Sequence, residues 1–412
     1  MTRANVKPWR KVSLVIITMA VVAGACWQMY PTSRVLGRTH HADGSFSIDL
    51  VSAPYRLDRV YLSMTGPRSN QPRIRLSESD PLDETLWLTG VEVEVVAADD
   101  LSPVSNDYFC HSNLTLNPET TSPEKHNGSF SVPTHADWRL FTLVPGRMSE
   151  KLPSGFGLPV KNATLLDNFT MALNQNPGQP DQRIRLRTRI WYRRGSDAQG
   201  LRPLFRRSLY VYQQHLPTRD ASGQPDAPGG HLGEQCAESC RSDQKGINPS
   251  SFVSLNQKLY AEHPGATCCV ENASPEGIVA QFGQENTAHW MVPPGRHVYR
   301  SEVTPQLNLP FDTTVHYVTG HLHPFGRSLK LIEMDSGETV FEIRAESLAD
   351  RLGVQTVSEI SSRKGEPIHT DRRYELVTEY VNTTDRPIDA MAILYLYAAD
   401  EPPLVADRQA AH

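Results

Sequence analysis

The chain has 412 residues, of which 39% are hydrophobic and 21% charged, so it can bury cores in more than one domain and is not globally disordered. Its 41 basic and 46 acidic residues give a net charge of -5, which argues against a nucleic-acid partner because such proteins usually carry a basic excess. The 31 prolines and 26 glycines favour a protein rich in strands and turns over a helical one.

Residues 1–30 predict a signal or membrane-anchor segment. The first 11 positions hold basic side chains and no acid, and an uncharged, mostly apolar run follows from Val12 to Trp27. The run includes Ala23-Gly24-Ala25-Cys26, which is similar to the lipobox of bacterial lipoproteins. An acylated lipoprotein, an uncleaved anchor and a cleaved signal are the three alternatives. All three predict an exported bacterial chain in the periplasm or at the cell surface, and the first two tether it to a membrane.

Export changes the interpretation of the cysteines, because an oxidising compartment favours disulfides. Four cysteines can pair crosswise into two bridges or can form a thiolate cluster for a soft metal: Cys236, Cys240, Cys268 and Cys269. Cys110 is left over, and we expect it to be a buried thiol.

Alternating segments predict the strands of the first half. Residues 91–95 and 183–187 alternate apolar and polar side chains, as half-buried strands do. The arginines of 183–187 could attract anions, although a solvated strand face is the favoured interpretation. Residues 208–212 predict another strand. Residues 346–351 predict a helix of one or two turns.

The fold class that follows is all-β, with two antiparallel, jelly-roll-like β-sandwiches after the export segment. We place the first sandwich at residues 45–214. A polar stretch rich in proline and glycine at 215–250 predicts a linker or long loop. The second sandwich is expected at 251–405.

The most informative segment runs from Asp312 to Gly326. Its Thr, Val and Tyr residues predict a strand, so His321 and His323 project from one face and can bind one metal ion. Pro324 ends the strand, which places the pair at a rim that ligands can reach. His316 has the opposite parity and should point away, unless Gly320 introduces a bulge. Ordinary structural histidines are the alternative.

The apolar segment from Ala390 to Tyr397 predicts a central strand and adds a third candidate ligand, Met391. Met391 is either core filler or a thioether ligand. Two imidazoles and a thioether form a soft donor set that suits Cu(I) much better than Mg, Ca or Mn.

These residues carry a resemblance to a known family. The segment His321-Leu-His323-Pro-Phe-Gly326, with Met391 after the polar turn Asn382-Thr-Thr-Asp385, resembles the C-terminal domain of the type II copper, ascorbate-dependent monooxygenases. That family includes peptidylglycine α-hydroxylating monooxygenase and dopamine β-monooxygenase. The resemblance implies a copper site on His321, His323 and Met391 that binds dioxygen, with ascorbate or another reductant as electron donor. Residues 101–110 and 152–157 resemble the family's N-terminal domain more faintly.

The chain departs from the family where a second copper would bind. The resemblance places Ala136, Asp137 and Asn174 at the positions of its three histidines. His111 and His135 lie nearby and offer an alternative site. We therefore expect one copper per chain.

Three functions stay open. The chain is a copper-dependent monooxygenase, a non-catalytic periplasmic copper-handling protein, or a surface-interaction protein whose site is degenerate. The sequence names no substrate and no protein partner. It contains no nucleophile elbow, phosphate loop or His-Glu-x-x-His helix, so hydrolase and kinase functions have no support.

Overall fold

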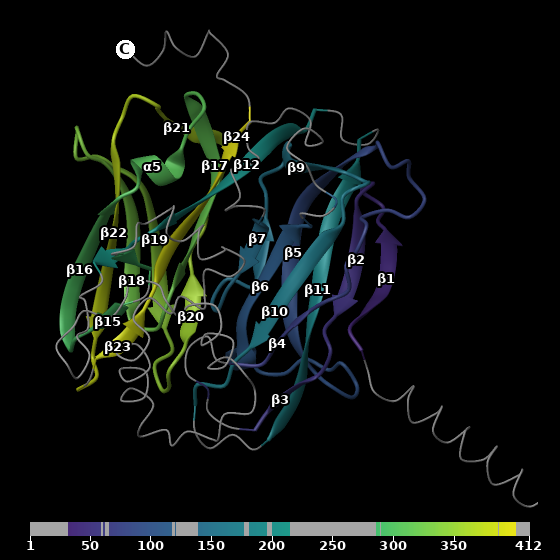
Figure 1. Ribbon diagram of the computed structural model, residues 1–412, viewed down its shortest axis with the longest axis horizontal. Helices are drawn as coiled ribbons and strands as arrows, with labels where there is room; N and C mark the ends of the chain where they lie inside the picture. Colours follow the sequence, from purple (N-terminus) through teal and green to yellow (C-terminus); the bar gives the residue numbers. More distant parts are fainter. Residues whose placement is uncertain are drawn as a thin grey trace, which may run out of the picture.

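The computed structural model describes residues 32–58, 61, 66–117, 120, 139–176, 181–195, 200–214, 286–288, 290–385 and 387–400. These residues form an all-β protein of two antiparallel β-sandwiches that lie side by side, which confirms the predicted fold class (Figure 1). No helix in these ranges is long and apolar enough to cross a membrane. The predicted export segment with Cys26 and the four-cysteine group Cys236, Cys240, Cys268 and Cys269 lie outside the described residues.

The first sandwich packs two sheets against each other. One sheet has the order β1 (Arg34–His40), β2 (Phe46–Val51), β11 (Gln182–Arg194), β5 (Thr85–Ala97) and β9 (Phe156–Lys161), with β3 (Tyr55–Leu57) beside β11 and β8 (Ser149–Lys151) beside β5. The other has the order β4 (Arg68–Asn70), β10 (Leu166–Ala172), β6 (Phe109–Leu116) and β7 (Arg139–Leu143). Strand β1 begins well before residue 45, where the sequence places the start of this sandwich.

The two long strands of the first sandwich form as their alternation predicts. On β5 the valines at 91, 93 and 95 are buried while Glu92 and Glu94 lie on the outer face. The arginines of β11 stand opposite these acids, and Arg189 lies 2.6 Å from Asp49 and 3.2 Å from Glu92. The arginines of this face therefore pair with acidic side chains on the neighbouring strands. This agrees with the interpretation of the basic face as a solvated strand face.

The second sandwich also packs two sheets together. One has the order β12 (Arg202–Tyr210), β24 (Ala392–Ala399), β17 (Thr313–Leu322) and β21 (Ile360–Ile368). The other has the order β16 (Gly295–Glu302), β22 (Tyr374–Asn382), β18 (Gly326–Glu333), β19 (Thr339–Ser347) and β20 (Val354–Val357). Two small ribbons complete it: β13 (Gln213–Gln214) with β14 (Asn286–Thr287), and β15 (Trp290–Val292) with β23 (Ile388–Ala390).

Strand β12 lies in the second sandwich, although the sequence places it in the first. It pairs antiparallel with β24 from Leu204 to Tyr210. At Arg202 and Pro203 it also pairs in parallel with β9, so one continuous sheet runs through both sandwiches. The chain thus enters the second sandwich before the polar stretch at 215–250, because the central strand β24 needs a neighbour on each side.

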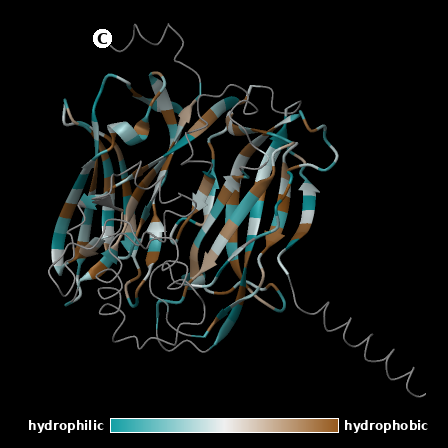
Figure 2. Ribbon diagram, viewed as in Figure 1, coloured by the Kyte–Doolittle hydropathy of each residue, from teal (hydrophilic) through white to brown (hydrophobic). Residues whose placement is uncertain are grey.

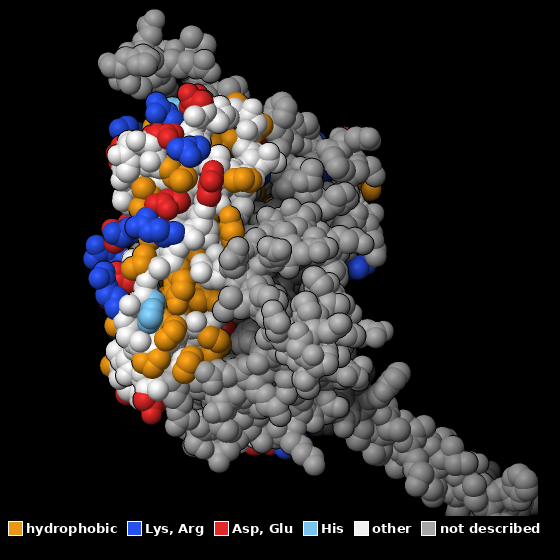
Figure 3. Space-filling view, turned by 60° about the vertical axis from the view of Figure 1, so that its left-hand side comes forward, with side chains coloured by type: hydrophobic (Ala, Val, Ile, Leu, Met, Phe, Trp, Pro, Cys, Tyr) orange, Lys and Arg blue, Asp and Glu red, His pale blue; other side chains and the backbone are white. Residues whose placement is uncertain are grey.

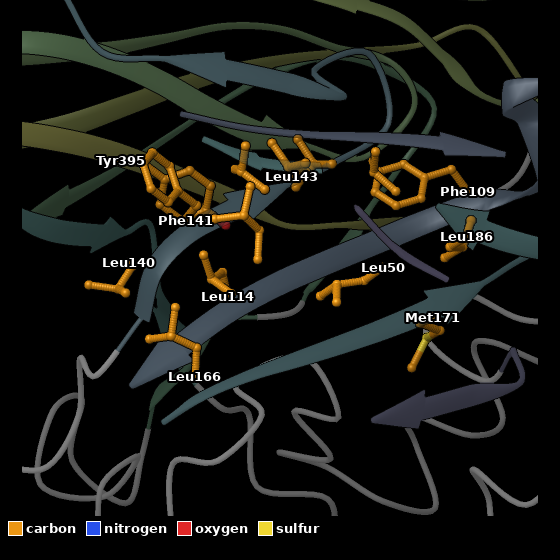
Figure 4. Close-up of a cluster of buried hydrophobic side chains, with 14 of the residues drawn as sticks. Leu50, Phe109, Leu114, Leu140, Phe141, Leu143, Leu166, Met171, Leu186 and Tyr395 are labelled. Carbon is orange, nitrogen blue, oxygen red and sulfur yellow. The ribbon is translucent and has the colours of Figure 1, made fainter. Parts of the chain in front are cut away.

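Strand β24 is buried on both faces, as its continuous apolar sequence predicts. Figure 2 colours the strands by the hydropathy of their residues. The even-numbered residues of β24, such as Leu394 and Leu396, join the core of the second sandwich. Odd-numbered Ile393, Tyr395 and Tyr397 join the core of the first. Figure 4 shows Tyr395 beside Phe141 of β7. One face of this sheet therefore forms the boundary between the two sandwiches.

The predicted helix at residues 346–351 is wrong. Glu346 lies in β19, opposite Thr356 of β20, and residues beyond Ser347 form bends. Buried Phe341, Ile343 and Ala345 alternate with less buried neighbours, and this period of two continues into Glu346. The described helices are short: η1 (Asn106–Tyr108) and α5 (Thr304–Leu307).

The outer sheet of the second sandwich carries intermingled charges of both signs (Figure 3). Arg296 pairs with Glu379 at 2.8 Å across β16 and β22, and Lys330 lies 3.7 Å from Glu342 across β18 and β19. Such exposed pairs each contribute about 0–1 kcal/mol, so they support strand pairing and leave the core to determine stability.

Candidate metal centre

His321 and His323 lie at the end of β17, as the sequence predicts. Their ring centroids are 5.0 Å apart with the rings nearly perpendicular. The strand ends at Leu322, and Pro324 follows His323 directly. Both histidines line a cavity of about 290 Å³ between the two sandwiches. They are therefore close to each other and beside a space that a small ligand can enter.

Met391 lies on the same face of the sheet as the two histidines. Pairing of His321 with Ile393 and of Leu322 with Ala392 brings Met391 opposite His323, and the His323 amide donates to the Met391 carbonyl at 3.3 Å. Side chains directly opposite each other in antiparallel strands share a face, with Cβ atoms about 4.5–5.5 Å apart. Met391 is 1% exposed and packs in the core of the first sandwich. It does not line the cavity.

A buried tyrosine fixes the backbone of this turn. Tyr380, on β22 of the opposite sheet, accepts a hydrogen bond from the His323 amide at 3.2 Å and donates one to the Met391 carbonyl at 2.6 Å. Burial raises the pKa of the Tyr380 hydroxyl far above its ordinary value, so it stays protonated and keeps donating. Its one hydroxyl thus holds the backbones of His323 and Met391 together.

A buried carboxylate contacts the ring of His323. Nδ1 of His323 lies 2.8 Å from Oδ2 of Asp389, and both side chains are 6% exposed. Asp389 belongs to β23, two residues before Met391. Asp389 is not among the site residues predicted from the sequence, although its position two residues before Met391 is a signal for it.

The first sandwich supplies the opposite wall of the cavity, with Phe109, Cys110, Met148 and Leu173. Cys110 is a buried thiol, as expected, and its Sγ lies 3.3 Å from Nδ1 of His111. The same wall also carries Asn106, Asp107 and Gln175, so both soft or apolar and polar side chains line this side of the cavity.

A loop of the second sandwich, residues 348–355, closes one side of the cavity and is tied to the first sandwich. Arg351 contacts Asp107 at 2.7 Å. Asn176 exchanges two hydrogen bonds with the backbone of Leu352, at 2.9 and 3.1 Å. These contacts hold the two walls of the cavity at a fixed separation.

His316 does not line the cavity of His321 and His323, but its ring turns toward the first sandwich, where its parity predicts the opposite face of the sheet. Its ring packs on Phe156 of β9 with centroids 4.0 Å apart. The reversal comes from an irregularity in β17 between Val315 and Tyr317, and not from Gly320. Burial lowers the pKa of His316, and its nitrogens lie 3.0 Å from the Thr314 hydroxyl and from the Ser362 carbonyl. His316 is a neutral structural histidine that does not line the cavity.

Farther along the same interface lies a buried carboxyl, Glu150, which the sequence analysis also missed. The hydroxyl of Tyr397 lies 2.8 Å from Oε2 of Glu150 and 3.0 Å from the Leu140 carbonyl. Burial raises the pKa of Glu150 to about 7, against the opposing effect of the Arg206 guanidinium. In the same region the Tyr317 hydroxyl donates to Glu359, and Glu359 pairs with Arg147 at 3.1 Å.

Part of the position expected for a second copper is described. Asn174 is buried, and its side chain accepts a hydrogen bond from the Asn176 amide at 3.2 Å, as a turn residue does. His111 is buried and stacks on Phe169 with centroids 5.7 Å apart. His135, Ala136 and Asp137 lie outside the described residues.

Within the part of the chain that the structure describes, no three His, Cys, Asp or Glu side chains are grouped closely enough to hold one metal ion. The predicted set of two histidines and a methionine is of a different kind, because its third donor is a thioether. Two features fit this donor set to a soft metal ion. The strand register places His321, His323 and Met391 on one face of the sheet, and the neighbouring wall carries the sulfur atoms of Cys110 and Met148.

No family model matches the chain, and no curated protein matches it. The solved structures that it resembles do so weakly. The STIV MCP aligns with a TM-score of 0.28 at 8% identity, covering 88% of this chain and 100% of that one. Coconut allergen cocosin aligns at 0.16 and 11% identity, covering 87% and 78% of the two chains. Procruciferin, an 11S globulin from Brassica napus, aligns at 0.17 and 9%, covering 88% and 79%. Likenesses at these TM-scores carry no argument about this chain.

Proposed function

We propose that this chain is an exported copper-binding protein that holds one Cu(I) ion with His321, His323 and Met391. The observation that supports this most strongly is the pairing of β17 with β24, which brings the three side chains to one face of one sheet. At the end of these strands the His323 amide donates to the Met391 carbonyl, so the backbones of the two residues lie next to each other.

The surroundings of the three donors favour a soft ion. Imidazole and thioether donors suit Cu(I), whereas Mg²⁺, Ca²⁺ and Mn²⁺ require carboxylate, carbonyl and water oxygens. The cavity of about 290 Å³ gives the two imidazoles a side that a small molecule can reach. Met391, which is 1% exposed, would support the ion from the buried side.

Copper held there would supply dioxygen binding and one-electron chemistry, as the resemblance to the copper monooxygenases implies. The chain's own residues would orient the ion, leave one side of it open to the cavity and exclude bulk water from the other. Ascorbate or another reductant would be the electron donor.

A second candidate function is copper handling without catalysis. It is favoured by Asn174, whose side chain makes a turn hydrogen bond where the family's second copper would need a histidine. Oxygen consumption with ascorbate, measured on the copper-loaded protein, separates the two candidates. Slow or absent consumption supports the handling function.

Equilibrium dialysis against Cu(I), followed by metal analysis, tests the site itself. We expect about one copper per chain, and loss of that copper in the double variant His321→Ala/His323→Ala with the fold retained. His369→Ala is the matched control, because this histidine lies on the surface and faces Asp312 at 3.4 Å. Copper retained by the double variant, or lost equally in the control, would contradict the site.

Export and membrane tethering are proposed from residues 1–27 alone. Fractionation of cells that produce the full chain tests them, with Cys26→Ser as the variant. Release of the variant from the membrane fraction would support acylation of Cys26, whereas retention would favour an uncleaved anchor.

A further inference from the structure

We infer that Asp389 is a positioning residue, which orients the imidazole of His323 so that Nε2 would be the nitrogen that binds a metal ion. This inference rests on the proposed copper site. Asp389 would not touch the ion, because its contact is with the opposite nitrogen of the ring.

The first observation is the contact between the two side chains. Oδ2 of Asp389 lies 2.8 Å from Nδ1 of His323, and each side chain is only 6% exposed. A carboxylate buried this deeply is costly unless a polar or charged group compensates it, so the contact is a specific feature of the fold. The backbone of Asp389 is itself held by pairing with Met291 of β15.

The second observation is that different groups hold the backbone and the ring of His323. Its backbone is held by the Tyr380 hydroxyl and the Met391 carbonyl. These contacts fix where the ring begins but leave it able to rotate about its side-chain bonds. The Asp389 carboxylate contacts the ring itself and so favours the rotamer that the structure shows.

The chemical consequence concerns the tautomer. A carboxylate beside Nδ1 favours the proton on that nitrogen, which leaves the lone pair of Nε2 available to a metal ion. It also makes the imidazole a better donor. Outer carboxylates of this kind typically change metal affinity by about 10–100-fold when they are removed.

The chain contains a second His–Asp pair that serves as a control. Nδ1 of His369 lies 3.4 Å from Oδ2 of Asp312, and the side chains are 41% and 32% exposed. The two atoms of this pair are farther apart than those of the His323–Asp389 pair, and its side chains are more exposed to solvent. Neither residue lines the cavity. Replacing Asp312 removes the same kind of contact without changing the candidate site.

The first measurement is the Cu(I) affinity by competition with a chromophoric chelator. We expect Asp389→Ala to bind Cu(I) about 10–100-fold more weakly than the parent. Asp389→Asn keeps one acceptor oxygen and should fall between the two. Asp312→Asn should bind like the parent. Parental affinity in both Asp389 variants would overturn the inference.

The second measurement needs no metal. Nitrogen-15 NMR of the apo chain, with labelled histidine and His323 assigned through His323→Gln, reports the tautomer directly. We expect the proton on Nδ1 in the parent and a shift toward Nε2 in Asp389→Ala. A parent His323 with its proton on Nε2 would overturn the inference even if no Asp389 variant folds.

The two proposals fail in different ways. If the parent chain binds no Cu(I) but shows the expected tautomer, the copper site is wrong and the Asp389 contact still orients His323. If the parent binds Cu(I) and both Asp389 readouts match the parent, the copper site stands and the role of Asp389 is wrong.

Discussion

The interface between the sandwiches has two regions that differ in kind, although the same sheet face forms both. In the candidate metal region, His321 and His323 border a cavity, and the buried Met391 lies opposite His323. In the packed region, the hydroxyls of the buried Tyr317 and Tyr397, on the same two strands, donate to Glu359 and Glu150. The same two strands thus carry histidines that border a cavity in one region and tyrosines that are buried and hydrogen-bonded in the other.

The comparison of the two regions can be tested by substitutions, and we expect the largest effect from Glu150→Gln. The quantity to measure is the pH dependence of the free energy of unfolding. Burial raises the pKa of Glu150 from 4.5 to about 7. Between these values the unfolded chain releases a proton that the folded chain keeps, so the stability from this group is full below pH 4.5 and falls until about pH 7. The shift corresponds to about 3 kcal/mol.

The glutamine variant cannot ionise, so we expect it to lack this fall in stability between pH 4.5 and 7. Denaturant unfolding at several pH values measures the slope. Glu338→Gln, which removes a carboxyl exposed to water, is the control and should keep the parental slope. The same slope in Glu150→Gln as in the parent would show that Glu150 does not titrate in this window.

A smaller effect is expected from Tyr397→Phe. The change removes a buried hydroxyl and leaves the Leu140 carbonyl and the Glu150 carboxyl without that partner, which should cost about 1–3 kcal/mol. Tyr212→Phe removes a hydroxyl at an exposed contact and should cost much less. Equal costs in the two variants, by thermal or denaturant unfolding, would mean that the packed region does not depend on this bond.

The smallest effect on stability is expected from Arg351→Ala, which breaks the ion pair with Asp107 beside the cavity. The pair is exposed to solvent, so its loss should cost less stability than either of the two buried changes above. Hydrogen exchange should nevertheless become faster in residues 348–355, because one of the ties to the first sandwich is gone. Unchanged exchange there would show that the other contacts with the first sandwich, such as those of Asn176, hold the loop without this ion pair.

Local pattern predicted the elements well where one strand carries a clear period. The alternation of Val91 to Val95 predicted β5, and the continuous apolar run to Tyr397 predicted a central strand. The parity of His321 and His323 placed both at the same rim. Patterns of this kind reflect which face of a strand is buried, and that information is contained in the sequence itself.

The remaining features depend on contacts between distant residues. The assignment of β12 to the second sandwich depends on its pairing with β24, about 190 residues later. Strand parity alone does not predict the face on which His316 lies, because the irregularity in β17 depends on its partner strand. Glu150 and Tyr380 gave no sequence signal, because a buried polar residue is recognised only when its tertiary partners are known.

The measurement that tests the central claim most directly is X-ray absorption on the Cu(I)-loaded chain, comparing the parent with Met391→Leu, a change that nearly conserves volume. The register of β17 and β24 brings Met391 opposite His323, so we predict a sulfur scatterer in the parent that is absent from the variant. A sulfur scatterer that survives in the variant would contradict the proposed site and direct attention to the cysteines.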